Sequence, residues 1–152
     1  MLKKTTLCYI EQDNQYLMLY RNKKKNDVNQ GKWIGIGGHM DAEETADECI
    51  LREVKEETGL TLKKFQLCGK LYFYIDDLTE MSYLYKATEF EGNLMECDEG
   101  DLKWISKDDI LGLNLWEGDS LFLKKLISED SYFEMKLVYQ KNKLVDYEVY
   151  ER

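Results

Sequence analysis

The chain has 152 residues, a length typical of one domain, and we treat residues 1–152 as a single unit. A hydrophobic share of 43% is enough for a core. The formal charge of −9 argues against a nucleic-acid duplex or an anionic membrane as a partner, because both need basic patches. It does not argue against a small nucleotide, since metal ions can screen phosphates from acidic side chains.

The sequence shows no sign of export or membrane insertion. The N-terminus lacks the apolar run of a signal peptide, and no apolar segment is long enough to span a bilayer. The four cysteines have no metal-binding spacing and are typical of reduced thiols. We therefore expect a cytoplasmic protein, and the sequence leaves open whether it is a monomer or a homodimer.

Two runs rich in β-branched and aromatic residues open the chain. Residues 5–10 and 16–21 are predicted strands, and the polar stretch 11–15 between them is a predicted hairpin turn. A polar, locally basic loop follows over residues 22–30. Most of this loop is expected to be solvated, but Lys23 and the two lysines after it could face the phosphates of a ligand.

Glycine alternates with bulky residues between Gly31 and Gly38. This pattern predicts a strand that kinks and runs close to a ligand, where the bare main chain can offer its carbonyl and amide groups. A plain turn would also explain Gly37 and Gly38. The immediate continuation into an acidic helix favours the ligand-contact interpretation.

A helix is predicted to begin near Thr45 and to end at Gly59. Thr45 followed by Glu48 is a capping-box pattern, and glycine is the usual C-terminal stop. The helix carries three carboxylates at spacings of three and four residues, which places them together on one surface: Glu53, Glu56 and Glu57. Such like charges repel one another, and a hard divalent cation is the obvious group to offset the repulsion.

The position of these acids on the helix matters, because most charge runs are simply solvated faces. At about 100° per residue, Ala46, Ile50 and Val54 form an apolar stripe, and Glu53 and Glu57 border it. An ordinary surface helix keeps its charges away from the core. Burying the bordering acids is costly without a counter-charge, so the placement favours a bound cation over a solvated face.

The next segments, residues 65–75 and 81–90, are two predicted strands joined by a turn over 76–80. Both are strongly aromatic, and alternation places Tyr72 and Tyr74 on one face. Core packing would explain these aromatic side chains. The flat apolar walls that a purine pocket needs would explain them as well.

The last third of the chain continues the alternation of element types. An acidic loop over 96–101 precedes a short strand at 102–105 and a helical turn at 106–111. A helix is predicted over 121–127 with Asp119 or Ser120 as its N-cap. A closing hairpin pairs 132–139 with 143–150 around a turn at 140–142. The order of elements predicts an α/β fold, a mixed sheet with helices on its faces.

The segment 38–60 resembles the Nudix box at every fixed position: glycine, five residues, Glu, seven residues, Arg-Glu, an aliphatic residue, any residue, Glu-Glu, any residue, Gly, aliphatic. The resemblance implies the Nudix α/β/α sandwich and a metal-dependent hydrolase acting on a nucleoside diphosphate linked to another group. It also implies a site for Mg²⁺ or Mn²⁺ made from Gly37, Glu53, Glu56, Glu57 and Glu99. Arg52 would orient the glutamates, and Glu99 would serve as a ligand or a base. The base is left open among Glu53, Glu56 and Glu99, with Glu56 or Glu53 favoured.

Within that family, further residues resemble the MutT-type 8-oxo-dGTP diphosphatases, namely Lys32-Trp33-x-Gly-x-Gly-Gly, Trp104 and the segment 116–120. The resemblance implies hydrolysis of 8-oxo-dGTP to 8-oxo-dGMP and pyrophosphate, which removes a mutagenic precursor of DNA. Trp116 would then stack on the base and Asp119 would bond its ring edge. The remaining substrate-binding candidates are Tyr72, Tyr74 and Met81 as pocket walls, and Lys23 near the phosphates.

Two departures bear on the substrate. The human enzyme of this type has asparagine where this chain has Ile34, and a second aspartate where this chain has Gly118. A site that loses polar contacts loses discrimination between hydrogen-bonding patterns. The alternatives are a Nudix hydrolase for ADP-ribose, a pterin triphosphate or nucleoside triphosphates in general, and a non-catalytic domain that only binds a nucleotide.

Overall fold

A computed structural model describes residues 2–128 and 131–151 of the chain. The strands are β1 (Leu2–Gln12), β2 (Gln15–Arg21), β3 (Trp33–Ile34), β4 (Ile36–His39), β5 (Thr61–Ile75), β6 (Leu78–Glu91), β7 (Gly100–Ser106), β8 (Phe133–Gln140) and β9 (Lys143–Glu151). The helices are α1 (Ala46–Thr58) and α2 (Glu117–Ser128), with a 3₁₀ turn, η1 (Ile110–Gly112). Neither described helix has the length and apolar character needed to cross a bilayer.

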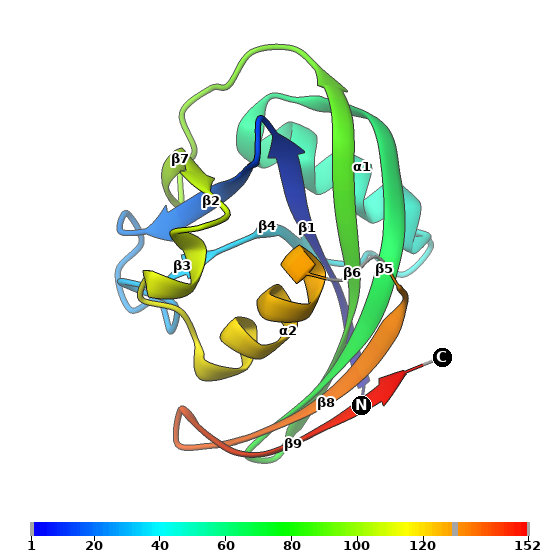
Figure 1. Ribbon diagram of the computed structural model, residues 1–152, viewed down its shortest axis with the longest axis vertical. Coiled ribbons are helices and arrows are strands. Elements are labelled where there is room, and N and C mark those ends of the chain that lie inside the picture. The colour runs from blue at the N-terminus through cyan, green and yellow to red at the C-terminus, as the bar shows by residue number, and fades with distance from the viewer. Residues whose placement is uncertain (1, 129–130, 152) are drawn as a thin grey trace.

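The described strands form a nine-stranded mixed sheet in the order β3-β2-β1-β6-β5-β8-β9, with β4 paired to β1 and β7 to β2 (Figure 1). The pairs β1–β6 and β5–β8 are parallel, and the other pairs are antiparallel. The predicted mixed sheet with helices on its faces is therefore confirmed. Its strands are longer than predicted at several ends, as at Thr61 and Leu78.

The two helices cover opposite faces of the sheet, as alternation along β1 shows. Tyr9 packs in the apolar cluster that contains α2 residues such as Phe122. Its neighbours Cys8 and Ile10 pack in the cluster that contains Ile50 of α1. Since successive residues of a strand point to opposite faces, α1 and α2 are separated by the sheet. This is the sandwich that the resemblance implied.

Three hairpin turns are tighter than the sequence predicted. The β1–β2 turn is only Asp13 and Asn14, which both have positive φ, at 49° and 61°. The β8–β9 turn likewise uses Lys141 and Asn142, at 50° and 67°. Positive φ at both central residues gives the twist that matches paired antiparallel strands, so these turns need only two residues. The β5–β6 turn has positive φ at Asp76 (51°).

Helix α1 has the ends that its sequence predicts. The Thr45 hydroxyl accepts a hydrogen bond from the Glu48 amide at 3.1 Å, and the Glu48 carboxylate accepts one from the Thr45 amide at 2.9 Å. Gly59 ends the helix in the left-handed region at φ 82°. Both predicted caps are confirmed, and they fix where the acidic face of α1 begins and ends.

Helix α2 corrects the sequence prediction. It begins at Glu117, and neither Asp119 nor Ser120 is its N-cap. Both residues are already inside the first turn, where their amides donate to the Trp116 carbonyl at 3.0 and 3.3 Å. The prediction failed because Asp119 resembles a capping residue in sequence, whereas its side chain is buried against the cavity described below.

Candidate active site

Two glycines of β4 allow the acidic helix to approach the sheet closely. A Cβ at Gly37 would lie 1.9 Å from the Thr6 carbonyl oxygen on β1. A Cβ at Gly38 would lie 2.6 Å from the Glu53 carboxylate. The backbone of β4 therefore forms a cradle that only glycine leaves open, and the Glu53 carboxylate of α1 fills it.

Arg52 holds three of the glutamates in place. Its Nε and Nη2 donate to the two oxygens of Glu44 at 2.7 and 2.9 Å. Its Nη1 lies 3.0 Å from Glu53 Oε1 and 3.3 Å from Glu56 Oε2. The guanidinium lowers the pKa of the Glu44 carboxyl to about 2, and the same contacts raise the pKa of Arg52. Arg52 thus contacts Glu53 and Glu56, two of the three helix glutamates that it is expected to orient, and Glu44 anchors it from the loop before α1.

Glu57 and Glu99 complete an acidic cluster that also contains Glu53 and Glu56. Glu57 accepts a hydrogen bond from the Gly37 amide at 3.2 Å. Burial, followed by the neighbouring Glu99 carboxylate, raises the pKa of Glu57. Glu99 also forms ion pairs with Lys24 Nζ at 3.0 Å and with Arg21 Nη1 at 3.4 Å. Its hydrogen bonds with Glu57 and Lys24 lower the pKa of its carboxyl. Sequence positions 57 and 99 are therefore neighbours in space.

The chemistry of these donors fits a hard divalent cation. Carboxylates from α1 and from the loop before β7 adjoin the Gly37–Gly38 backbone, and oxygen ligands of this kind suit Mg²⁺ or Mn²⁺. Burial also raises the pKa of Glu53, so positive charge at this point would stabilise its ionised form. As the side chains stand, no three acidic, histidine or cysteine residues of the described chain form a closed ligand set. In this arrangement Glu53 and Glu56 are ion-paired with Arg52.

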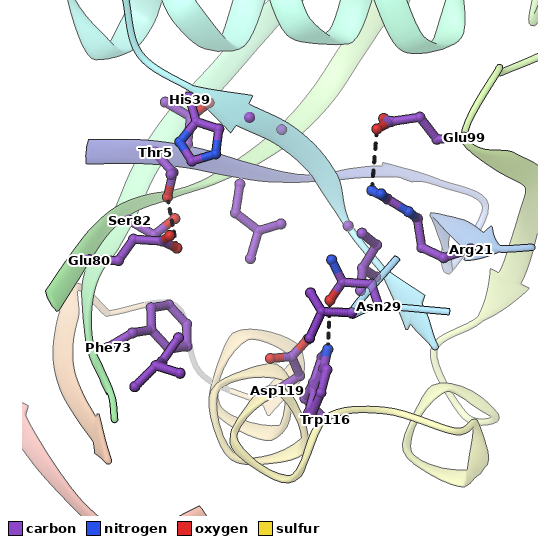
Figure 2. A pocket seen from close by; sticks show the side chains of 18 of the residues that line it. Thr5, Arg21, Asn29, His39, Phe73, Glu80, Ser82, Glu99, Trp116 and Asp119 are labelled. Atoms are coloured by element: carbon purple, nitrogen blue, oxygen red, sulfur yellow. Dashed lines mark hydrogen bonds and ion pairs between the residues drawn. The ribbon is translucent and has the colours of Figure 1, made fainter. Parts of the chain in front are cut away.

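A cavity of about 490 Å³ opens beside the acidic cluster (Figure 2). Its lining includes Gly37 and Glu99 at the acidic cluster and Trp116 and Asp119 from the start of α2. Apolar side chains supply much of the wall between them, namely Leu7, Val28, Ile34, Phe73 and Ile75. A volume of this size suits a small-molecule ligand. One concave space therefore joins Glu99 and Gly37 to the predicted base-binding pair, whereas Arg52, Glu53, Glu56 and Glu57 are absent from its lining.

Trp116 is fixed in the cavity wall from three sides. Its indole Nε1 donates to Asn29 Oδ1 at 2.8 Å. Lys32 Nζ lies 4.8 Å from the ring centroid, and Tyr139 packs edge-on against it at 6.1 Å between ring centroids. A ring held in this way offers a rigid flat surface to a ligand.

Asp119 is the most buried acid of the cavity, with 8% of its surface exposed. Burial raises the pKa of its carboxyl to about 7, and the nearby Lys32 offsets part of this rise. Figure 2 places the carboxyl beside Trp116 at the base of the cavity. Near neutral pH, such a group can either donate or accept a hydrogen bond from a ligand.

The packing around Gly118 disfavours a side chain at this position. Its amide donates to the Tyr139 hydroxyl at 2.7 Å, and a Cβ at this position would lie 2.6 Å from that same oxygen. Tyr139 also lines the cavity. A side chain at position 118 would therefore have to displace the Tyr139 hydroxyl, which disfavours the second aspartate of the human pattern in this chain.

Four of the predicted substrate-binding residues are absent from the cavity lining. Lys23 donates to the Cys97 carbonyl at 3.0 Å, and its neighbour Lys24 lines the cavity instead. Tyr72 and Tyr74 share a face as predicted, but they interact with Glu134 and Lys136 of β8. Met81 pairs with Tyr72 across β5 and β6 and is buried.

The other face of β5 supplies the wall. Phe73 and Ile75 alternate with the two tyrosines and line the cavity, because adjacent residues of a strand point to opposite faces. Sequence reasoning also missed Arg21 and Asn29, whereas Lys24 belongs to the run of three lysines predicted to face the phosphates. Arg21 ends a predicted strand and Asn29 lies in a loop taken as solvated, so the only available signal was their closeness in sequence to the glycine-rich segment.

Comparisons with known proteins point to the same family as the motif in segment 38–60. The family model described as NUDIX domain matches residues 1–126. The chain is 31% identical over 128 residues to the uncharacterized Nudix hydrolase YvcI of Bacillus subtilis (strain 168), covering 80% of this chain and 77% of that protein. It is 29% identical over 132 residues to a Danio rerio protein named oxidized purine nucleoside triphosphate hydrolase, covering 86% and 83%. The crystal structure of a MutT protein from Bacillus halodurans superposes with a TM-score of 0.89 at 30% identity, covering 97% of each chain.

The match covers most of the chain and includes the acidic helix, the glycine cradle and the loop that carries Glu99. Members of this family hydrolyse small nucleotide substrates and generally use divalent metal ions. This chain belongs to the Nudix family and is a Nudix hydrolase.

Proposed function

We propose that this protein is a Mg²⁺- or Mn²⁺-dependent diphosphatase of purine nucleoside triphosphates, with 8-oxo-dGTP as the substrate to be tested first. The observation that carries this proposal is that one cavity reaches both the acidic end and the base-binding end of the site. It joins Glu99 and the Gly37–Gly38 cradle to Trp116 and Asp119. In the cell, such an activity would remove oxidised nucleotides from the cytoplasmic pool before they enter DNA.

The acidic cluster provides the hydrolytic end of the proposal. Glu53, Glu56, Glu57, Glu99 and the Gly37 carbonyl would hold the divalent cation. When bound, the cation would neutralise phosphate charge and make an attacking water more acidic. Glu56 and Glu53 are the candidate bases, since Arg52 contacts both carboxylates and fixes their direction. A positioned carboxylate can remove the proton of the attacking water.

The phosphates of the substrate would lie along Arg21 and Lys24. Both side chains line the cavity and face Glu99, at 3.4 and 3.0 Å. Their positive charges offset the acidic ligands at the end of the cavity where a polyphosphate must enter. Arg21 is only 12% exposed in its side chain, so its charge acts with less screening by solvent.

The base would lie against Trp116, with one ring edge on the Asp119 carboxyl. The indole is fixed by Asn29, and its exposed face suits stacking on a purine. The name of the Danio rerio relative, an oxidized purine nucleoside triphosphate hydrolase, supports a purine at this end. The carboxyl with a pKa of about 7 suits an edge that carries both a donor and an acceptor.

A second candidate is a Nudix hydrolase with a different nucleoside diphosphate derivative as its substrate, such as ADP-ribose, a pterin triphosphate or nucleoside triphosphates in general. The observation in its favour is Ile34. It lines the cavity with an apolar side chain where the human oxidised-purine enzyme has an amide. A non-catalytic nucleotide sensor is disfavoured, because every fixed residue of the Nudix box is present.

A substrate panel tests the proposal. Initial rates with Mg²⁺ are measured for 8-oxo-dGTP, dGTP, dATP and ADP-ribose, with product identification. We expect pyrophosphate and the nucleoside monophosphate from 8-oxo-dGTP, at a kcat/KM above that for dGTP. Equal rates on every nucleotide would point to a general hydrolase. Brisk cleavage of ADP-ribose with none of 8-oxo-dGTP would refute the purine triphosphate assignment.

The matched variants are Glu56→Gln and Glu43→Gln. Glu56 belongs to the proposed ligand set, whereas Glu43 is an exposed glutamate just before α1. Loss of one metal ligand or base should reduce kcat by roughly 10²-fold or more. Glu43→Gln should keep the parent rate, which controls for the simple loss of one negative charge. Parent turnover in Glu56→Gln would mean that the metal role is misassigned.

A further inference from the structure

The cavity has a second polar end that the proposed function does not use. Thr5 of β1 and Glu80 and Ser82 of β6 line it on the side opposite Arg21 and Glu99 (Figure 2). The parallel pairing of β1 with β6 places Thr5 beside Ser82, and Glu80 lies two residues before Ser82 on the same face. Three polar side chains from two neighbouring strands therefore converge on one patch of a largely apolar wall.

These polar groups are poorly satisfied within the protein. Thr5 and Ser82 are buried, with 7% and 3% of their surface exposed. The Thr5 hydroxyl donates one long hydrogen bond to Glu80 Oε2, at 3.5 Å. Within the described chain, no lysine or arginine forms an ion pair with Glu80. A carboxylate with two oxygens can accept several hydrogen bonds, so Glu80 has accepting capacity directed into the cavity.

The two ends of the cavity also differ in charge. Arg21 and Lys24 lie at the Glu99 end, where phosphates are favoured. Glu80 lies at the other end, where a phosphate would meet a negative charge. This end therefore suits the part of a substrate that is remote from the phosphates and that carries hydrogen-bond donors. Figure 2 shows Glu80 and Asp119 on different walls of the same space, with Phe73 on the side of Glu80.

We propose that Glu80, oriented by Thr5, is a specificity-determining residue that accepts hydrogen bonds from the two adjacent donors of a guanine-type base, the ring N1–H and the 2-amino group. This inference rests on the proposed purine triphosphatase function and deepens it. A carboxylate matches two adjacent donors in a bidentate manner. Adenine presents an acceptor at N1, which would face the Glu80 oxygens unfavourably. Asp119 would then contact a different edge of the same base.

The experiment compares dGTP with dITP, which has the same ring but lacks the 2-amino group. The values of kcat/KM are measured with Mg²⁺ for the parent and for Glu80→Gln, Thr5→Val and Glu89→Gln. Glu89 is the matched control, because it is an exposed glutamate on the same strand that pairs with Lys64 outside the cavity. We expect the parent to prefer dGTP by roughly tenfold, since a buried acceptor left unpaired is unfavourable.

In Glu80→Gln this preference should fall to near unity, because the new amide hydrogens would face the donors of guanine. Thr5→Val should reduce it in part, and Glu89→Gln should leave it unchanged. If Glu80→Gln does not fold, as judged by circular dichroism, Glu80→Asp is used, and a lowered dGTP preference supports the proposal.

Two results would overturn the inference in distinguishable ways. If the parent turns over no purine triphosphate, the proposed function fails and the role of Glu80 fails with it. If the parent turns them over but the ratio of dGTP to dITP is the same in the parent and in the Glu80 variant, only the role of Glu80 is refuted.

Discussion

Single residues of this site have properties that depend on partners far away in the sequence. Glu57 is acidic like its neighbour Glu56, yet only Glu57 adjoins both the Gly37 amide and the Glu99 carboxylate. A Cβ at Gly118 would lie 2.6 Å from the hydroxyl of Tyr139, which is twenty-one residues away in the sequence. Asp119 begins a helix in sequence but is a buried wall residue in space. Local chemistry at each of these positions is therefore set by tertiary contacts.

Asp119 gives a pH-dependent prediction about stability. Its pKa is raised by burial from 3.8 to about 7, so the folded protein keeps a proton that the unfolded chain releases. Between these values the folded state binds more protons, and the free energy of unfolding falls as pH rises. Asp119→Asn removes this dependence. Relative to the parent, it should gain stability from pH 4 to pH 7, by at most about 4 kcal/mol.

The measurement is urea denaturation of the parent and of Asp119→Asn at pH 4.5, 6 and 8. Asp108→Asn, an exposed aspartate, serves as the control and should track the parent at each pH. A constant difference between the parent and Asp119→Asn across this range would show that Asp119 ionises near its ordinary pKa.

At the scale of elements, α1 and β4 act together. The glycine cradle of β4 allows the helix to lie close to the sheet, and the helix caps set which of its residues face the cradle. An offset of one residue in α1 would turn Glu53 and Glu57 by about 100° around the helix axis. The N-terminal cap is therefore part of the positioning of the acidic cluster.

Removing this cap should cost stability. In Thr45→Ala the Glu48 amide loses its side-chain acceptor, and the capping box is broken. We expect a loss of about 1 kcal/mol in the free energy of unfolding. Thr45→Ser keeps the hydroxyl and should stay close to the parent. Urea denaturation curves measure both variants, and equal midpoints for Thr45→Ala and the parent would contradict a stabilising role for the cap.

The elements also show what the sequence could and could not predict. The ends of α1 were predictable, because Thr45, Glu48 and Gly59 act through local hydrogen bonds. Alternation showed that Tyr72 and Tyr74 share a face, but the face that meets the cavity depends on how β5 pairs with β6 and on where α2 packs.

The start of α2 and the cavity residues were harder to predict from the sequence, because they too depend on contacts between distant elements. Arg21 and Lys24 meet Glu99 only after β2 and β7 pair, across more than seventy residues of chain. Contacts of this kind depend on the tertiary structure and leave no periodic pattern in the sequence.

At the scale of the whole molecule, the acidic cluster connects elements that are distant in the chain. Gly37 lies on β4, Glu57 on α1 and Glu99 in the loop before β7. In a chain with a formal charge of −9, the half-buried contact between Glu57 and Glu99 brings two carboxyl groups together. A cation bound among them would take the place of the proton that Glu57 and Glu99 share, and would hold the three elements together.

Divalent ions should therefore stabilise the fold, and the effect should depend on Glu57. A ligand that binds only the folded state adds about 2.7 kcal/mol at a hundred times its Kd, which is worth several degrees in Tm. We expect Mg²⁺ or Mn²⁺ to raise the Tm of the parent in this way. Glu57→Gln keeps an acceptor for the Gly37 amide but cannot ionise, so it avoids the cost of a carboxyl whose pKa is raised by burial and removes the charge that a cation would need. Without metal it should be more stable than the parent, and with metal it should gain much less.

The Tm values of the parent and of Glu57→Gln are measured by thermal unfolding with and without Mg²⁺, at ionic strength matched with NaCl. Glu43→Gln is the control and should respond to Mg²⁺ as the parent does. The stability gain arises from binding alone, so it is independent of which nucleotide the enzyme hydrolyses. An equal rise in Tm for the parent and Glu57→Gln would place the ion elsewhere on this acidic surface, because only a cation at the Glu57–Glu99 contact is sensitive to that one charge.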